Sequence, residues 1–221
     1  MGSMLKDREG AADLSQFYDA LAPQYDALYV DTIHYVEDEL VWQLSESIGP
    51  LGKVLSVGCG TGNDISILRL EPEKSVCVDF SKNMLRIARK KYPEYRFELH
   101  DVTQSPFRYN ADTVVALYGV VNYIGMRAFV RQVFQSGATK FIAILYANGY
   151  TPYNIDNIPH RFGVSDLIEL RQAFPSLRVS GLSYFMDSND IPFEPLLTAQ
   201  KLMTMQPSSL SGCKYWVCYS T

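Results

Sequence analysis

Hydrophobic and polar positions alternate along this chain with two periods, and the order of the periods predicts a layered α/β fold. Short runs of branched apolar residues are separated by segments with helical spacing. Such alternation is typical of a mostly parallel sheet with helices on both faces. The last two predicted strands have no convincing helix between them, which favours an antiparallel C-terminal pair. The seven predicted strands cover residues 53–58, 75–80, 95–101, 112–119, 140–147, 177–185 and 214–220.

The helical segments carry recognisable ends and apolar stripes. Ser81 is placed to cap the helix that begins after the second strand, and Met84, Leu85 and Ala88 form its inner stripe. Ser165 is placed to cap the last helix in the same way. The predicted helices cover residues 32–48, 63–70, 81–93, 126–136 and 165–174.

Composition excludes several classes of protein. The 221 residues are 47% hydrophobic and 20% charged, which indicates a well-packed globular chain. The net charge is −4 and no block of Lys or Arg appears, which argues against nucleic acid as a partner. We find no signal peptide and no apolar run long enough to span a membrane. The cysteines lack metal-ligand spacing, so we expect reduced thiols, no metal and a cytoplasmic location: Cys59, Cys77, Cys213 and Cys218.

Three glycines follow the first predicted strand in the stretch VLSVGCGTGND. Gly58, Gly60 and Gly62 would let the backbone turn sharply at the carboxyl end of the sheet, where α/β proteins bind ligands. Asp79 ends the second strand and can accept hydrogen bonds from two ribose hydroxyls. Together these residues predict a nucleoside-bearing cofactor. A dinucleotide fingerprint would have a glycine at Asn63, which disfavours a nucleotide-dependent oxidoreductase.

Four segments, in this order and spacing, resemble the class I S-adenosylmethionine-dependent methyltransferases of small-molecule type. They are VLSVGCGTGND, VCVDFSKNML, LHDVTQSPF and DTVVALYGVVNYI, and the resemblance spans most of residues 14–185. It implies a Rossmann-like three-layer sandwich with an N-terminal helical lid. The implied cofactor is S-adenosyl-L-methionine, with S-adenosyl-L-homocysteine as product. The implied reaction is in-line transfer of a methyl group to an oxygen, nitrogen or carbon of a small molecule.

The same resemblance implies a role for each matched residue. The glycines would pack beside the amino-acid part of the cofactor, Asp79 would hold the ribose, and Asp101 would accept from the adenine amino group. Tyrosines of the segment FYDALAPQYDALY would close over the reacting end. The implied cofactor-binding residues are Tyr18, Tyr25, Gly58, Gly60, Gly62, Asp79, Phe80, Met84, Asp101, Val102, Tyr118 and Gly119.

The sequence departs from the family pattern at two places. Ser56 stands where the first glycine motif often carries an acidic residue, which weakens the case for a carboxylate that orients the methionine amine. No N-P-P-Y type motif follows the fourth predicted strand, where enzymes that N-methylate nucleic acids carry one.

Catalytic candidates are few, because a sulfonium methyl group is already activated. A general base is needed only if the acceptor arrives protonated. His160, His34 and Tyr25 are the candidates, in that order. His160 follows the fifth strand and is either a pocket or a turn residue, whereas the alternative for His34 is an exposed position near a helix start.

We expect one methyltransferase domain over residues 1–221. Residues 1–12 are predicted to be a tag remnant or disordered, 13–50 a helical lid, and 51–221 the cofactor-binding core with an irregular insertion at 187–210. The chain is expected to be a monomer or homodimer without nucleic-acid or membrane partners. Two alternatives stay open, namely a non-methylating enzyme that binds the same cofactor and a non-catalytic cofactor-binding subunit.

Overall fold

The computed structural model of the protein describes residues 14–30, 32–148, 158–182 and 215–220. Seven strands form one sheet in the order β3-β2-β1-β4-β5-β7-β6. Both β1 and β4 are buried over their whole length, which explains why most of their residues are apolar. The strands are β1 Val54–Val57, β2 Ser75–Asp79, β3 Arg96–Leu99, β4 Thr113–Ala116, β5 Lys140–Tyr146, β6 Arg178–Leu182 and β7 Tyr215–Ser220.

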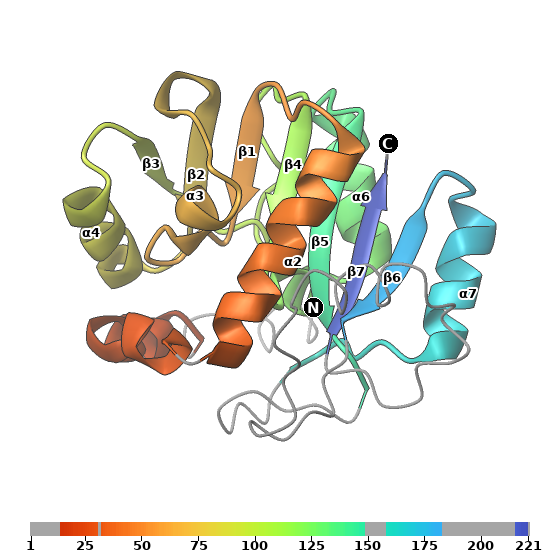
Figure 1. Ribbon diagram of the computed structural model, residues 1–221, viewed down its shortest axis with the longest axis horizontal. Helices are drawn as coiled ribbons and strands as arrows, with labels where there is room; N and C mark the ends of the chain where they lie inside the picture. The colour runs from red at the N-terminus through yellow and green to blue at the C-terminus, as the bar shows by residue number, and fades with distance from the viewer. Residues whose placement is uncertain (1–13, 31, 149–157, 183–214, 221) are drawn as a thin grey trace, which may run out of the picture.

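Strand directions confirm the predicted fold class. Strands β1 to β5 pair in parallel, while β7 pairs antiparallel with both β5 and β6. The last strand therefore inserts between β5 and β6, and it runs against its neighbours in Figure 1. The carboxyl ends of the five parallel strands lie together at one edge of the sheet, which is where the site forms.

Helices cover both faces of the sheet (Figure 1). Helices α2 Thr32–Ile48, α3 Asn63–Ile67 and α4 Lys82–Lys91 contribute buried residues to one apolar cluster. The other cluster contains residues of α5 Val120–Ile124, α6 Met126–Gln135 and α7 Val164–Ala173. Successive residues of β5 alternate between the two clusters, as expected for a strand buried on both faces.

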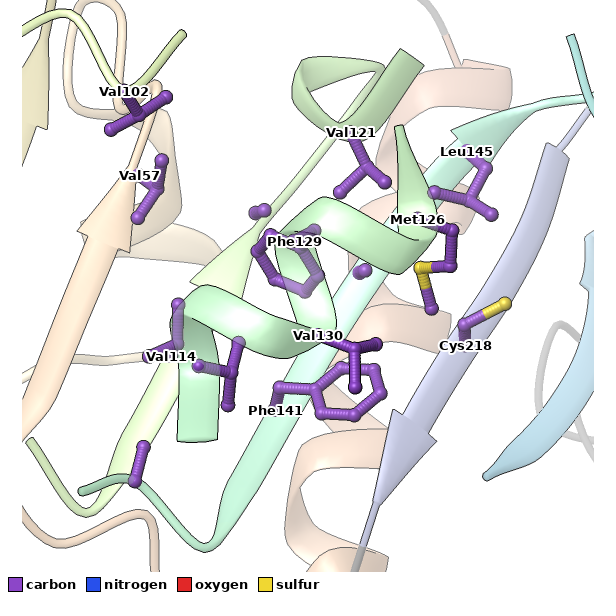
Figure 2. Packing of buried hydrophobic residues seen from close by; sticks show 14 of the residues in the cluster. Val57, Val102, Val114, Val121, Met126, Phe129, Val130, Phe141, Leu145 and Cys218 are labelled. Carbon is purple, nitrogen blue, oxygen red and sulfur yellow. The ribbon is translucent and has the colours of Figure 1, made fainter. Parts of the chain in front are cut away.

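The second cluster is built around aromatic contacts from α6 to the sheet (Figure 2). Phe129 is fully buried, and its ring lies 5.7 Å from that of Phe141 and 6.1 Å from that of Phe107. Both pairs meet edge to face, the arrangement that aromatic quadrupoles favour. This packing holds α6 against β5 and against the segment that precedes β4.

Helix ends show where the sequence patterns were right and wrong. Ser81 caps α4 as predicted, since its Oγ accepts from the Met84 N–H at 3.1 Å. The cap predicted at Ser165 is wrong, because α7 begins one residue earlier and Gly163 is its N-cap. The Gly163 N–H instead donates to the Asp166 carboxylate at 2.7 Å. The sequence did not predict α5, which is too short to show a helical period.

The N-terminal region is helical, as the resemblance implied. Residues 14–21 form a helix, followed by the 3₁₀ turns η1 Ala22–Gln24 and η2 Asp26–Tyr29 and then by α2. We call residues 14–30 together with α2 the lid. Residues 14–30 lie beside the carboxyl ends of the strands (red to orange in Figure 1).

Some sequence predictions concern residues that the structure does not describe. The predicted segment 1–12, the predicted insertion 187–210 and Cys213 lie outside the described residues. Within the described part of the chain, Cys59, Cys77 and Cys218 are buried free thiols. The helices described here are all too short or too polar to span a bilayer.

Candidate functional site

The glycine loop connects β1 to α3 and turns back over the end of β2. The N–H groups of Gly58 and Cys59 both donate to the Val78 carbonyl, at 2.8 and 3.1 Å. Gly58 has φ +69°, and a Cβ there would lie 2.3 Å from a methyl group of Val120, so close packing excludes any side chain. Gly60 has φ +53°, and an added Cβ there would make only an ordinary van der Waals contact, 3.9 Å from a ring carbon of Tyr25.

A carboxylate at the end of β2 connects this loop to the next helix. Asp79 Oδ2 accepts from the Gly60 N–H at 2.9 Å, and Oδ1 accepts from the Ser81 N–H at 2.8 Å. Asp79 is 5% exposed, and burial raises its pKa to about 6 although backbone N–H groups oppose the shift. Its position is therefore determined by the backbone on both sides.

Asp101 has a similar local arrangement after β3. Its Oδ1 accepts from the Thr103 N–H at 2.9 Å and from the Thr103 hydroxyl at 2.6 Å. Asp79 and Asp101 thus each use one carboxylate oxygen in an Asx turn two residues long. Both also line the cavity described next.

One cavity brings together most of the predicted cofactor-binding residues. It lies between the carboxyl ends of the strands and the lid. Gly62 and Gly119 do not line it, since a Cβ on Gly62 would meet the Tyr92 ring and one on Gly119 the Tyr146 ring. The predicted residues that line it are Tyr18, Tyr25, Gly58, Gly60, Asp79, Phe80, Met84, Asp101, Val102, Tyr118 and the catalytic candidate His34.

His160 is not among the residues that line this cavity. It lies in a separate shallow hollow with Gly125 and Met126, and its side chain is exposed. Asn122 bonds the backbone there, because its amide donates to the His160 carbonyl at 2.7 Å and its carbonyl accepts from the Tyr146 N–H at 2.9 Å. His160 was the first candidate for a general base, but its side chain does not line this cavity.

Asp64 is a cavity residue that sequence reasoning missed. It lies in the first turn of α3, is 5% exposed, and accepts a hydrogen bond from Ser56 Oγ at 2.5 Å. Burial above all, together with the charges of Asp79 and Asp38, raises the pKa of Asp64 to about 7, against the hydrogen bond from Ser56. A carboxylate two positions after the last glycine was the available signal. The family pattern often has an acidic residue at the position of Ser56, and here the Asp64 carboxylate lies beside Ser56 instead.

The lid forms an aromatic wall of the cavity. Tyr18 lies edge-on to Phe80, with ring centroids 5.7 Å apart, and its hydroxyl is 3.5 Å from that of Tyr123. The rings of Tyr25 and Tyr29 lie 5.0 Å apart. Burial raises the pKa of both Tyr18 and Tyr25 well above the ordinary value, so their hydroxyls stay protonated.

Two lid carboxylates attach the lid to the core. Asp19 Oδ1 accepts from Ser81 Oγ at 2.5 Å and from the Asn83 N–H at 2.9 Å, at the start of α4. Asp26 accepts from Thr61 Oγ1 at 2.5 Å and pairs with Lys91 at 2.8 Å. Burial alone would raise the pKa of Asp26, but the bonds from Lys91 and Thr61 lower it. The lid therefore contacts both the glycine loop and α4.

Helix α2 contributes a pair of polar side chains to the cavity. His34 and Asp38 are one helical turn apart and both line it. Tyr118 Oη donates to Asp38 Oδ1 at 2.7 Å. Burial raises the pKa of Asp38, while the Tyr118 hydroxyl and the His34 charge oppose this shift.

The cavity is rich in carboxylates. Four carboxylates and two imidazoles line it, and no Lys or Arg is among its described lining residues. The described residues also contain no group of three or more His, Cys, Asp or Glu side chains arranged to hold a metal ion. A cavity of carboxylates and tyrosine rings is suited to a ligand that carries positive charge.

Comparison with known proteins agrees with this geometry. A family model described as a methyltransferase domain matches residues 54–137. The chain is 32% identical over 117 residues to the demethylmenaquinone methyltransferase of Chlamydia caviae, an alignment that covers 50% of each protein. The chain spans about half the length of the curated relatives it matches.

Solved structures resemble the fold over nearly the whole chain. A DhpI–SAH complex matches with TM-score 0.59 at 13% identity, covering 94% of both chains. A TehB-like SAM-dependent methyltransferase from Corynebacterium glutamicum matches with TM-score 0.54 at 16% identity, covering 95% of this chain and 98% of that one. The family model covers the glycine loop, Asp79 and Asp101, which are the elements that build the cavity. Residues 54–137 therefore match a methyltransferase domain, and the chain has a fold similar to that of solved S-adenosylmethionine-dependent methyltransferases.

Proposed function

We propose that this chain binds S-adenosylmethionine in the cavity and transfers its methyl group to a small-molecule acceptor. One observation carries the proposal. The glycine loop, Asp79 and Asp101 line one cavity, and tyrosines of the lid line it as well. The DhpI–SAH complex, whose fold this chain resembles, supports the same reading.

The adenosine end of the donor fits the wall formed by β2, β3 and α4. Each carboxylate oxygen has two lone pairs, so Asp79 can accept from ribose hydroxyls in addition to its backbone bonds. Phe80, Met84 and Val102 provide the apolar surface that an adenine ring needs. Asp101 has one oxygen outside its turn bonds for the adenine amino group.

The amino-acid end fits the glycine loop. Gly60 leaves room for a ligand against the backbone, and Asp64 lines the cavity on the same side. We assign the donor ammonium to Asp64, which Ser56 holds in position. This pair takes the role that the family pattern gives to an acid at position 56.

Residues of the site have alignment and water exclusion as their main tasks. When bound, the donor supplies a methyl group on a sulfonium centre that needs no further activation. Tyr18, Tyr25 and Tyr118 bring ring faces and oxygen atoms to the region where that cation would lie. Closure of the lid excludes water, and positioning of the two reactants lowers the barrier.

A small acceptor suits this site better than a polymer. The lid is bonded to the core at Ser81, Asn83 and Thr61, which restricts access from the face beyond the strand ends. The net charge of −4 disfavours an anionic polymer. We therefore propose a metabolite-sized acceptor and a protein without a nucleic-acid or membrane partner, active in the cytoplasm as a monomer or homodimer.

Calorimetric titration with S-adenosylhomocysteine tests the donor site. We expect wild-type protein to bind this product, and Asp79→Asn to weaken binding about tenfold or more, because charged-group hydrogen bonds are among the stronger ones. Glu73→Gln, an exposed carboxylate close to β2, is the matched control and is expected to bind as wild type. Absence of binding to the wild-type protein would refute the proposal.

A further inference from the structure

The polar pair on α2 has a different origin from the rest of the cavity. Asp64, Asp79 and Asp101 follow strands of the core, at the positions assigned above to the donor. Asp38 and His34 come from the lid instead, and Asp38 meets the core at Tyr118, two residues after β4. This leaves a carboxylate and an imidazole in the cavity that the donor does not use.

Hydrogen bonds to Tyr118 hold the Asp38 carboxylate in place. Tyr118 has φ +51°, a backbone conformation that is uncommon for a residue with a side chain. In this conformation its hydroxyl reaches Asp38 at 2.7 Å, and its carbonyl accepts from the Tyr146 hydroxyl at 3.0 Å. The bond engages one oxygen of the Asp38 carboxylate, Oδ1. The carboxylate is therefore held in a set orientation at the wall of the cavity.

The surroundings of Asp38 favour a cation. Tyr29, Tyr118 and Tyr123 bring aromatic rings to the same cavity, and ring faces attract cations. No Lys or Arg among the described lining residues neutralises the carboxylates. A phosphate or carboxylate on the acceptor would meet like charge without a partner, which is costly at a partly buried site.

We propose that Asp38 binds the acceptor, that the acceptor is an amine which enters as its ammonium form, and that His34 takes the proton that must leave before methyl transfer. This inference rests on the proposed function. It names the substrate class as primary or secondary amines of metabolite size. It also gives His34 a role that follows from its position one turn before Asp38.

The proton and electron balance is simple. The ammonium nitrogen first gives one proton to the imidazole of His34. Its freed lone pair then forms the bond to the methyl carbon, and the carbon–sulfur electron pair stays on sulfur, giving the neutral thioether product. The new N-methyl ammonium carries the positive charge that sulfur lost, and Asp38 pairs with it until the product leaves.

Matched acceptors and a matched variant test the proposal. The probes are 2-phenylethylamine, tyramine and histamine, each beside the alcohol and the carboxylic acid of the same skeleton. Release of S-adenosylhomocysteine is measured with wild type, Asp38→Asn and Glu46→Gln, an exposed carboxylate on the same helix. Calorimetry records amine binding to the S-adenosylhomocysteine complex of each variant, and thermal unfolding confirms that each variant is folded.

We expect turnover with one or more amines and none with the alcohols and acids. Asp38→Asn should lower kcat/KM and amine affinity about ten- to one-hundredfold while S-adenosylhomocysteine binds as to wild type. Glu46→Gln should match wild type. Turnover restricted to alcohols or acids, no turnover with any amine, or equal loss of donor binding in Asp38→Asn would each overturn the inference. If the wild-type protein does not bind S-adenosylhomocysteine, the proposed function itself fails.

Discussion

Asp64 and Ser56 are eight residues apart in the chain and share a hydrogen bond of 2.5 Å in the buried wall of the cavity. Ser56 lies in β1 and Asp64 in the first turn of α3, on either side of the glycine loop. The loop brings the two together, and the carboxylate that β1 lacks is supplied by the following helix. Burial in this wall raises the pKa of Asp64, so binding at the proposed donor site should depend on pH.

Donor affinity should rise between about pH 6 and about pH 8, because a cationic ligand favours the charged form of Asp64, whose pKa is raised to about 7. Asp64→Asn should weaken binding of S-adenosylhomocysteine about tenfold and remove most of this pH dependence. Calorimetry in buffers of different ionisation enthalpy measures both affinity and proton release. The Ser56 hydroxyl and the Cys59 thiol also face this carboxylate but do not titrate in this range, whereas the carboxylates of Asp38 and Asp79 do, so an unchanged pH profile in Asp64→Asn would move the titration to Asp38 or Asp79.

Ligand-free protein should lose stability as the pH rises. Burial raises the folded-state pKa of Asp64 to about 7 and of Asp79 to about 6, both above the ordinary value of an unfolded aspartate. The folded state then binds more protons than the unfolded state, and the free energy of unfolding falls from about pH 4 to about pH 7. Urea unfolding across this range measures the slope. Asp64→Asn should flatten it, and a wild-type slope of the opposite sign would contradict the assignment.

Loosening the lid should speed ligand release. Asp26 contacts Thr61 in the glycine loop and Lys91 at the end of α4. Both charged side chains are partly exposed, so the effect of Asp26→Asn is modest, about two- to fivefold faster dissociation of S-adenosylhomocysteine. Stopped-flow fluorescence measures that rate. Glu71→Gln, which removes a carboxylate paired with Lys74 on the surface, is the control and should not change it.

The two histidine candidates should behave differently. His34→Gln should lower kcat about a hundredfold with donor affinity unchanged, as expected for loss of a proton acceptor. His160→Gln should leave turnover unchanged, because His160 does not line the cavity. Steady-state kinetics on an accepted amine separates the two. A large loss in His160→Gln with intact donor binding would restore His160 as the base.

The aromatic core behind β4 should be sensitive to truncation. Phe129→Ala removes a fully buried ring that packs against Phe107 and Phe141, and should cost about 3–5 kcal/mol of unfolding free energy. Phe134 lies on the same helix but is 53% exposed, so Phe134→Ala should stay within about 0.5 kcal/mol of wild type. Chemical denaturation compares the two. Equal losses would mean that α6 does not pack as described.

Local patterns were enough to predict the sheet. Strands β1, β4 and β5 are mostly apolar because both of their faces are buried, and this signal is visible without any partner. Ser81 was recognised as a cap because capping joins a side chain to a backbone group three residues away. The short helix α5 gave no such signal, since one turn shows no period.

Sequence patterns were sufficient for the fold class, the glycine loop, Asp79 at the end of β2 and Asp101 after β3, because each depends on residues close together in the chain. Which side chains share the cavity followed from long-range packing alone. It brings Asp64 to Ser56, brings Asp38 of the lid to Tyr118, and leaves His160 outside. These relationships depend on how loops and helices pack on the sheet. The sequence around each of these residues does not reveal which distant residues it will contact.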